Sequence, residues 1–272
     1  MLQKQTGIAH RMNIYRINSI RNTGLALLLM MITNYLHGQK NFTHQNLLWY
    51  GLFTTIKINE NWYVQHELQQ RHFIRPAAQH QFLFRSHLHR NLGRRGREAS
   101  VGLCLFLQDP NNPSAAVRLT VPELRPHVET ACRQEVGRLT LDHRFRLEAR
   151  FFHNTNQART ALEDGFVFGN YRFRYKIQAG MLLLKLAGGK YIELKISNEL
   201  HLNAKNRNTK RVFDQNRIYA GISCHFTQAL TTDIGYLNLF QQRPGGDYFN
   251  RQILRFTLYH KLNLHPGKKA RR

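Results

Sequence analysis

Residues 138–152, RLTLDHRFRLEARFF, decide the fold because two kinds of side chain alternate along them. One set is polar or charged: Arg138, Thr140, Asp142, Arg144, Arg146, Glu148 and Arg150. The intervening set is mostly apolar: Leu139, Leu141, His143, Phe145, Leu147, Ala149 and Phe151. Successive side chains of a β-strand point to opposite faces, so this stretch is one long strand with a charged face and an apolar face.

The length and charge of this strand favour a membrane barrel. Strands of globular proteins usually run about 5–6 residues, whereas a tilted membrane-spanning strand needs about 9–11. A face that carries four arginines and two acids is too polar for a dry core. We therefore expect an all-β, antiparallel, up-and-down transmembrane β-barrel, with its apolar face toward lipid and an arginine-rich lumen.

The beginning of the chain has the order of a secretory signal. Arg16 and Arg21 form a basic region, residues 25–32 (LALLLMMI) an apolar region, and residues 36–38 a cleavage site. Eight apolar residues are too few for a membrane-spanning helix, which needs about 18. We expect residues 1–38 to be a signal peptide with a true start at Met12, residues 39–264 the barrel, and residues 265–272 a basic tail. The expected location is the outer membrane, after Sec-type export.

The composition is strongly basic. The formal net charge is +24, and removal of the four basic residues before position 39 leaves +20. Such an excess suggests nucleic acid or an anionic membrane surface. No zinc-finger spacing, P-loop or RNA-binding signature is present, and the arginines recur at period two along strands, so nucleic acid is not an expected partner. Three cysteines without a CxxC motif, Cys104, Cys132 and Cys224, are read as small apolar fillers.

Alternating segments fill the rest of the chain. The expected strands cover residues 48–58, 61–73, 79–91, 98–108, 123–136, 138–152, 167–180, 190–203, 214–227, 230–242 and 249–264. Tight connections at 59–60, 137, 186–189 and 228–229 alternate with long ones at 109–122, 153–166 and 204–213 and an intermediate one at 243–248, as in outer-membrane barrels. Because bacterial barrels are normally even-numbered, we expect a total of 10–12 strands. Twelve is favoured, with a further strand in 40–47, and ten is the alternative.

Several of these segments resemble one family. The stretches are ELRPHVETACRQEVGRLTLDHRFRLEARFF (123–152), YRFRYKI (171–177), ISNELHLN (196–203), FDQNRIYAGISCHF (213–226) and LTTDIGYLNLFQQ (230–242). Together they resemble the domain-of-unknown-function family 2490, exported proteins of Gram-negative bacteria grouped with outer-membrane β-barrels. The resemblance covers about residues 47–264. It implies an architecture and a location but no activity.

The charged faces of neighbouring strands would meet inside the barrel. We expect the acids Glu129, Glu148, Glu193 and Glu199 to be flanked by arginines in salt bridges that hold the lumen shut. The competing interpretation is an anion-preferring passage or cavity lined by Arg144, Arg146, Arg174, Arg217 and Arg255, because rings of arginine favour anions.

Catalysis has little support in the sequence. No HExxH or other metal-ligand spacing occurs among the histidines, and Ser197 near His201 has no identifiable oxyanion or acid partner. We expect no enzyme, metal or cofactor, with an outer-membrane lipid hydrolase or acyltransferase as a minor hypothesis. The leading hypothesis is an outer-membrane barrel in contact with lipid, either a small pore for an anionic solute or a plugged structural protein. The alternative is a soluble periplasmic or secreted β-barrel that holds an anionic lipid or metabolite. The oligomeric state is left open.

Overall fold

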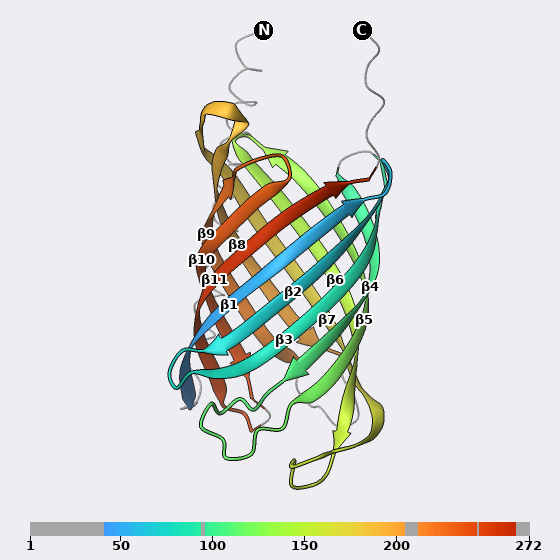
Figure 1. Cartoon of the computed structure of the whole chain (residues 1–272), viewed down its shortest axis with the longest axis vertical. Coiled ribbons are helices and arrows are strands. Elements are labelled where there is room, and N and C mark those ends of the chain that lie inside the picture. Colours follow the sequence, from blue (N-terminus) through green and yellow to red (C-terminus); the bar gives the residue numbers. More distant parts are fainter. Residues whose placement is uncertain (1–40, 94–95, 205–211, 244, 265–272) are drawn as a thin grey trace, which may run out of the picture. The chain divides into compact units, whose positions relative to one another are not determined.

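A computed structural model describes residues 41–93, 96–204, 212–243 and 245–264. Within these residues eleven strands form one closed barrel (Figure 1). The strands are β1 (Phe42–Lys57), β2 (Trp62–Phe73), β3 (Ala78–Asn91), β4 (Arg97–Gln108), β5 (Val121–Val136), β6 (Leu139–Thr155), β7 (Leu162–Lys185), β8 (Tyr191–Asn203), β9 (Phe213–His225), β10 (Leu230–Gln242) and β11 (Tyr248–Asn263). A single 3-10 turn, η1 (Ala187–Gly189), lies between β7 and β8 in this part of the chain. The expected signal peptide, the start at Met12 and the basic tail lie outside the described residues.

Each strand pairs antiparallel with the next, and the barrel closes between its first and last strands. The closing pair, β1 with β11, is parallel and runs from Phe42 opposite Tyr248 to Lys57 opposite Asn263. An odd number of up-and-down strands makes this unavoidable, because the first and last strands then run in the same direction. The all-antiparallel expectation is therefore wrong at this one pair. The favoured count of twelve is also wrong for the described residues, since most of 40–47 extends β1 instead of forming a separate strand.

On many strands a polar or charged face points inward and an apolar face points outward. On β6, Arg146 and Glu148 point into the lumen and are 2% and 1% exposed, while Leu147 between them points outward and is 45% exposed. At the middle of each described strand the outward side chain is a hydrophobic one with 38–55% of its surface exposed. These side chains are Tyr50, Leu68, Phe84, Leu103, Val128, Leu147, Phe173, Ile196, Ile218, Tyr236 and Leu254. We call them the outer belt.

The connections differ between the two ends of the barrel (Figure 1). One end, here the long-loop end, is where β2 is followed by β3, β4 by β5, β6 by β7, β8 by β9 and β10 by β11; its described connections include residues 109–120 and 156–161. The other, the short-turn end, is where β1 is followed by β2, β3 by β4, β5 by β6, β7 by β8 and β9 by β10; its described connections include residues 58–61, 137–138 and 226–229. Gly137 has a positive φ of 61° in the tightest of these turns, a conformation that favours glycine. The expected alternation is present, but the connection predicted at 153–166 is mostly strand, because β6 continues to Thr155 and β7 begins at Leu162.

The described residues include no helix that is long and apolar enough to cross a membrane.

Candidate functional site: the barrel lumen

The middle of the lumen is filled by a layer of ion pairs. Glu148 on β6 accepts hydrogen bonds from Arg172 (2.6 Å) and Arg174 (2.7 Å) on β7. Glu199 on β8 accepts from Arg174 (2.6 Å) and from Arg144 on β6 (2.6 Å). Arg174 thus bridges two carboxylates, so one guanidinium ties three neighbouring strands together. Charge-assisted bonds of this kind are about twice as strong as neutral ones.

The layer continues toward β2 through two further acids. Glu129 on β5 accepts a hydrogen bond from Arg146 (2.6 Å), and Glu67 on β2 accepts one from Arg85 on β3 (2.6 Å). We call the nine residues of this network the ion-pair layer: Glu67, Arg85, Glu129, Arg144, Arg146, Glu148, Arg172, Arg174 and Glu199.

Strand register explains why these partners meet. Glu67 lies directly opposite Arg85, Glu129 opposite Arg146, and Glu148 opposite Arg172. Side chains directly opposite each other in an antiparallel pair are close enough to interact. The alternation in sequence therefore places each charge in the lumen, and the register places an opposite charge beside it.

Cavities lie on both sides of the ion-pair layer. At the long-loop end a cavity of about 800 Å³ is bordered by Arg71, Arg125, Arg217 and Arg251 among others. At the short-turn end a cavity of about 880 Å³ is bordered by Arg138, Lys195 and Lys261, and a smaller one of about 350 Å³ by Arg144. Glu129, Arg146, Glu148 and Glu199 border none of these three cavities. They lie at the level between the cavities of the two ends.

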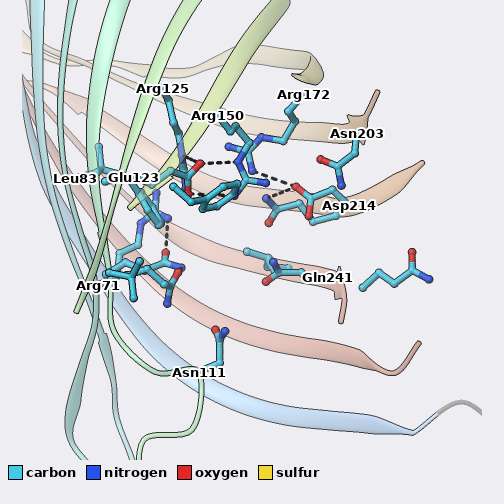
Figure 2. Close-up of a pocket in the computed structure, with 18 of the residues that line it drawn as sticks. Arg71, Leu83, Asn111, Glu123, Arg125, Arg150, Arg172, Asn203, Asp214 and Gln241 are labelled. Carbon is cyan, nitrogen blue, oxygen red and sulfur yellow. Dashed lines mark hydrogen bonds and ion pairs between the residues drawn. The ribbon is translucent and has the colours of Figure 1, made fainter. Parts of the chain in front are cut away.

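Charged side chains cover much of the wall of the long-loop cavity, and several of them form ion pairs. Glu123 lies between Arg125 and Arg150 and accepts hydrogen bonds from both, at 2.7 and 2.6 Å (Figure 2). Arg172 reaches Asp214 at 3.1 Å on the neighbouring wall (Figure 2). Ten arginines but only two acids border this cavity: Arg71, Arg85, Arg125, Arg150, Arg159, Arg172, Arg174, Arg217, Arg243 and Arg251, against Glu123 and Asp214. The lining of this cavity is therefore mostly basic, although Arg85, Arg172 and Arg174 also pair with acids of the ion-pair layer.

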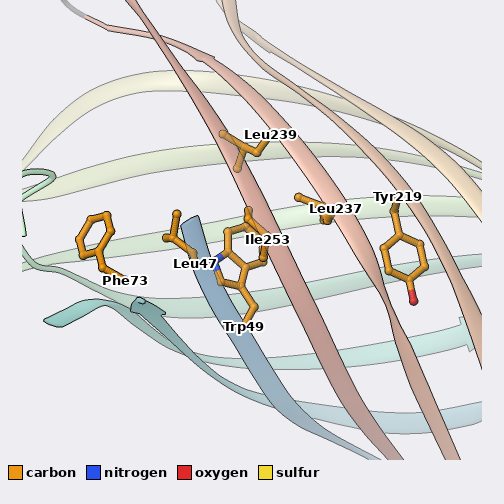
Figure 3. Close-up of a cluster of buried hydrophobic side chains, with 7 residues drawn as sticks. All are labelled: Leu47, Trp49, Phe73, Tyr219, Leu237, Leu239 and Ile253. Atoms are coloured by element: carbon orange, nitrogen blue, oxygen red, sulfur yellow. The ribbon is translucent and has the colours of Figure 1, made fainter. Parts of the chain in front are cut away.

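The apolar side of the lumen lies where the barrel closes (Figure 3). A cluster of buried hydrophobic side chains comes mainly from β1, β9, β10 and β11: Leu47, Trp49, Phe73, Tyr219, Leu237, Leu239 and Ile253. The wall of the lumen where the barrel closes is thus more apolar than the wall that carries the ion-pair layer, although Arg217, Arg251 and Arg255 also face the lumen there. The rule that polar side chains face the lumen does not predict this apolar wall. The sequence feature that indicates it is the stretch 47–53 (LLWYGLF), which is apolar on both strand faces.

The predicted lining arginines all face the lumen but occupy different places. Arg174 and Arg217 border the long-loop cavity, and Arg144 borders the small cavity at the other end. Arg146 is buried within the ion-pair layer. Arg255 stacks on Tyr219, 5.3 Å from the ring centre, and donates a hydrogen bond to Thr257. These five residues therefore form no single ring.

The predicted acids also divide into two groups. Glu129, Glu148 and Glu199 belong to the ion-pair layer. Glu193 is apart from them, at the short-turn end, where Lys195 lies 3.8 Å away and His225 lies within hydrogen-bonding distance (3.3 Å). The expectation that arginines flank Glu193 in salt bridges is therefore wrong within the described residues, because the residues opposite it on the neighbouring strands are Leu182 and Ser223.

Several buried histidines lie beside other polar side chains of the lumen. His127 approaches His87 at 3.3 Å, and His201 lies between Glu199 (3.2 Å) and Gln215 (3.1 Å). No group of three or more His, Cys, Asp or Glu side chains suited to a metal ion occurs in the described part of the chain. The three cysteines are free thiols.

Comparison with known proteins places this architecture in a family. A family model described as protein of unknown function (DUF2490) matches residues 46–250. The chain belongs to the DUF2490 family. The match includes every member of the ion-pair layer and stops just before Arg251. Among curated proteins no match was found.

Proposed function

We propose that this DUF2490 protein is an outer-membrane β-barrel whose lumen is closed at mid-height by the ion-pair layer. The outer belt carries the proposal. Eleven mid-strand side chains of the described barrel, one from each strand, are hydrophobic and exposed, and large contiguous apolar surfaces on water-soluble monomers are rare. A lipid environment removes the cost of this surface, and a closed barrel leaves no unpaired strand edge in the membrane.

Membrane extraction tests the location. The native protein should remain in the outer-membrane fraction after alkaline carbonate treatment and should dissolve only in detergent. Release by carbonate, as a monomer that stays in solution without detergent, would contradict the proposal and favour the soluble anion-binding barrel.

The closed lumen distinguishes a plugged barrel from an open pore. Glu129, Arg146, Glu148 and Glu199 fill the level between the two cavities, and their side chains are less than 10% exposed. We therefore expect the native protein to show no steady conductance in planar bilayers. The second candidate function, passage of small anions, is favoured by the ten arginines of the long-loop cavity and requires this layer to rearrange.

Removal of the central acids tests both ideas. In Glu148→Gln with Glu199→Gln, Arg174 loses both of its carboxylate partners, and Arg172 and Arg144 each lose one. The remaining positive charges then repel one another more strongly. We expect this variant to give current steps that prefer anions. Asp142→Asn is the matched control, because Asp142 pairs with a largely exposed Arg133 at the short-turn end. Large steady currents from the native protein would contradict the closed lumen.

A further inference from the structure

Two buried arginines at the long-loop cavity have no acidic partner. Arg71 is 5% exposed and Arg251 is 1% exposed. Within the described residues neither has a carboxylate oxygen within 4 Å of its guanidinium. In the same cavity Arg125, Arg150 and Arg172 all have one. Burial of an unpaired charge is unfavourable. The absence of a negative charge beside Arg71 and Arg251 is therefore unusual for buried arginines.

Neutral amides hold both guanidiniums in place. Arg71 donates to Gln81 (2.7 Å) and to Gln69 (3.0 Å). Arg251 donates to Gln45 (2.8 Å), Gln241 (2.7 Å) and Asn111 (2.8 Å). Amide oxygens accept hydrogen bonds from a guanidinium but leave its positive charge uncompensated. Within the described residues Nε of Arg71 is buried without a hydrogen-bond partner.

Asn111 is the part of this arrangement contributed by a loop. It lies in the connection between β4 and β5, and its backbone carbonyl also accepts a hydrogen bond from Gln45 (2.8 Å). The connection is thereby fixed over the cavity, with Asn111 at its edge (Figure 2). The two arginines are thus held in defined orientations, as in a pre-formed binding site.

An apolar surface adjoins the charged one. The guanidinium of Arg71 stacks on Trp49, 3.8 Å from the ring centre, and Arg217 lies 5.4 Å from the same ring. Trp49, Leu83, Phe106 and Leu239 border the cavity together with these arginines. A ligand here would meet cations on one side and aromatic or aliphatic carbon on the other. A volume of about 800 Å³ is in the range of pockets for small organic molecules, about 300–1,000 Å³.

We propose that the long-loop cavity binds a small amphiphilic organic anion, a carboxylate attached to an aromatic or short aliphatic body. Its carboxylate occupies the region between Arg71 and Arg251, and its body lies against Trp49. The anion supplies the negative charge that the neutral amides do not. The site depends on the lumen geometry alone, so it stands or falls separately from the proposed membrane location.

Trp49 provides a direct reporter of binding. The chain has two tryptophans, and Trp62→Phe leaves Trp49 as the only one. The full-length Trp62→Phe protein in non-ionic detergent is titrated with 4-nitrobenzoate, whose nitroaromatic ring quenches tryptophan. The neutral isostere 4-nitrobenzamide is the matched probe. We expect saturable quenching by the anion and at least tenfold weaker binding of the amide.

Arginine variants then locate the site. Arg71→Gln and Arg251→Gln, each in the Trp62→Phe background, should weaken 4-nitrobenzoate binding at least tenfold, and Arg71→Lys should weaken it less than Arg71→Gln. Arg138→Gln is the control, because this exposed arginine borders the cavity at the opposite end and should leave binding unchanged. Equal quenching by the two probes would overturn the proposal, and this comparison needs no arginine variant to fold. Unchanged binding in both Arg→Gln variants would also overturn it.

Discussion

Val128→Arg is the substitution that separates a lipid-facing belt from a water-facing one. Val128 is at the middle of β5, points outward, and is 55% exposed. Its cross-strand neighbours, Val101 on β4 and Leu147 on β6, are also exposed hydrophobic residues. In a membrane barrel, an arginine at the bilayer midplane costs about 2–4 kcal/mol. At a water-exposed position the same change stays within about 0.5 kcal/mol.

Gln134 supplies the matched control on the same strand and the same face. Six residues at about 3.3 Å each separate it from Val128, or about 20 Å along the strand. A strand tilt of about 40° reduces this separation to about 15 Å along the barrel axis. The apolar band of such barrels is about 25 Å tall, so its edge is about 12 Å from its centre. Gln134 therefore lies beyond the edge of the band. We therefore expect Gln134→Arg to cost only about 0–1 kcal/mol.

Urea unfolding of the barrel in phosphatidylcholine vesicles gives both values. The quantity compared is the free energy of unfolding of each variant relative to the native protein, followed by tryptophan fluorescence. A loss of about 2 kcal/mol or more for Val128→Arg, with a small loss for Gln134→Arg, fits the outer belt in lipid. Equal losses below about 0.5 kcal/mol for both variants would refute this reasoning.

Further predictions concern the lumen. Glu148→Gln leaves Arg172 and Arg174 without their shared carboxylate. It should lower the free energy of unfolding by about 3–5 kcal/mol in the same titration. A loss below about 1 kcal/mol would contradict a tightly coupled layer. Gly221→Ala should lower the free energy of unfolding by about 1–3 kcal/mol, because a Cβ at Gly221 would lie 2.6 Å from the carbonyl oxygen of Ile234. Gly245→Ala, where a Cβ meets nothing within 4 Å, is its control, and equal effects at the two glycines would contradict the close packing on this wall.

Much of the barrel is predictable from the sequence because odd and even positions of a strand point to opposite faces, a property we call strand parity that depends only on the local sequence. Alternation along 138–152 correctly assigns Arg146 and Leu147 to opposite faces, and the predicted strands agree with the observed ones mostly within a few residues. The number of strands and the closing pair are not local. They depend on which strands meet when the sheet curls, so the parallel pairing of β1 with β11 is invisible in either strand alone.

The candidate site is only partly predictable for a similar reason. Parity places Arg71 and Arg251 in the lumen, but it cannot tell which carboxylates or amides reach them. Their partners Gln81 and Asn111 come from a neighbouring strand and from a loop, and neither residue type marks an anion site by itself. For Glu193 the sequence correctly predicts the face of the strand, but it does not predict how far the carboxylate lies from the arginines.

Contact with acyl chains tests the orientation of the two faces most directly. Lipids with brominated acyl chains quench only tryptophans that touch the hydrocarbon. The probe variant carries Leu147→Trp together with Trp49→Phe and Trp62→Phe, and the comparison protein is Trp62→Phe, which keeps the lumen-facing Trp49. We expect strong quenching of the tryptophan in Leu147→Trp and little quenching of Trp49. Protection of the tryptophan at position 147, or quenching of Trp49 to the same extent, would contradict a lipid-facing outer belt.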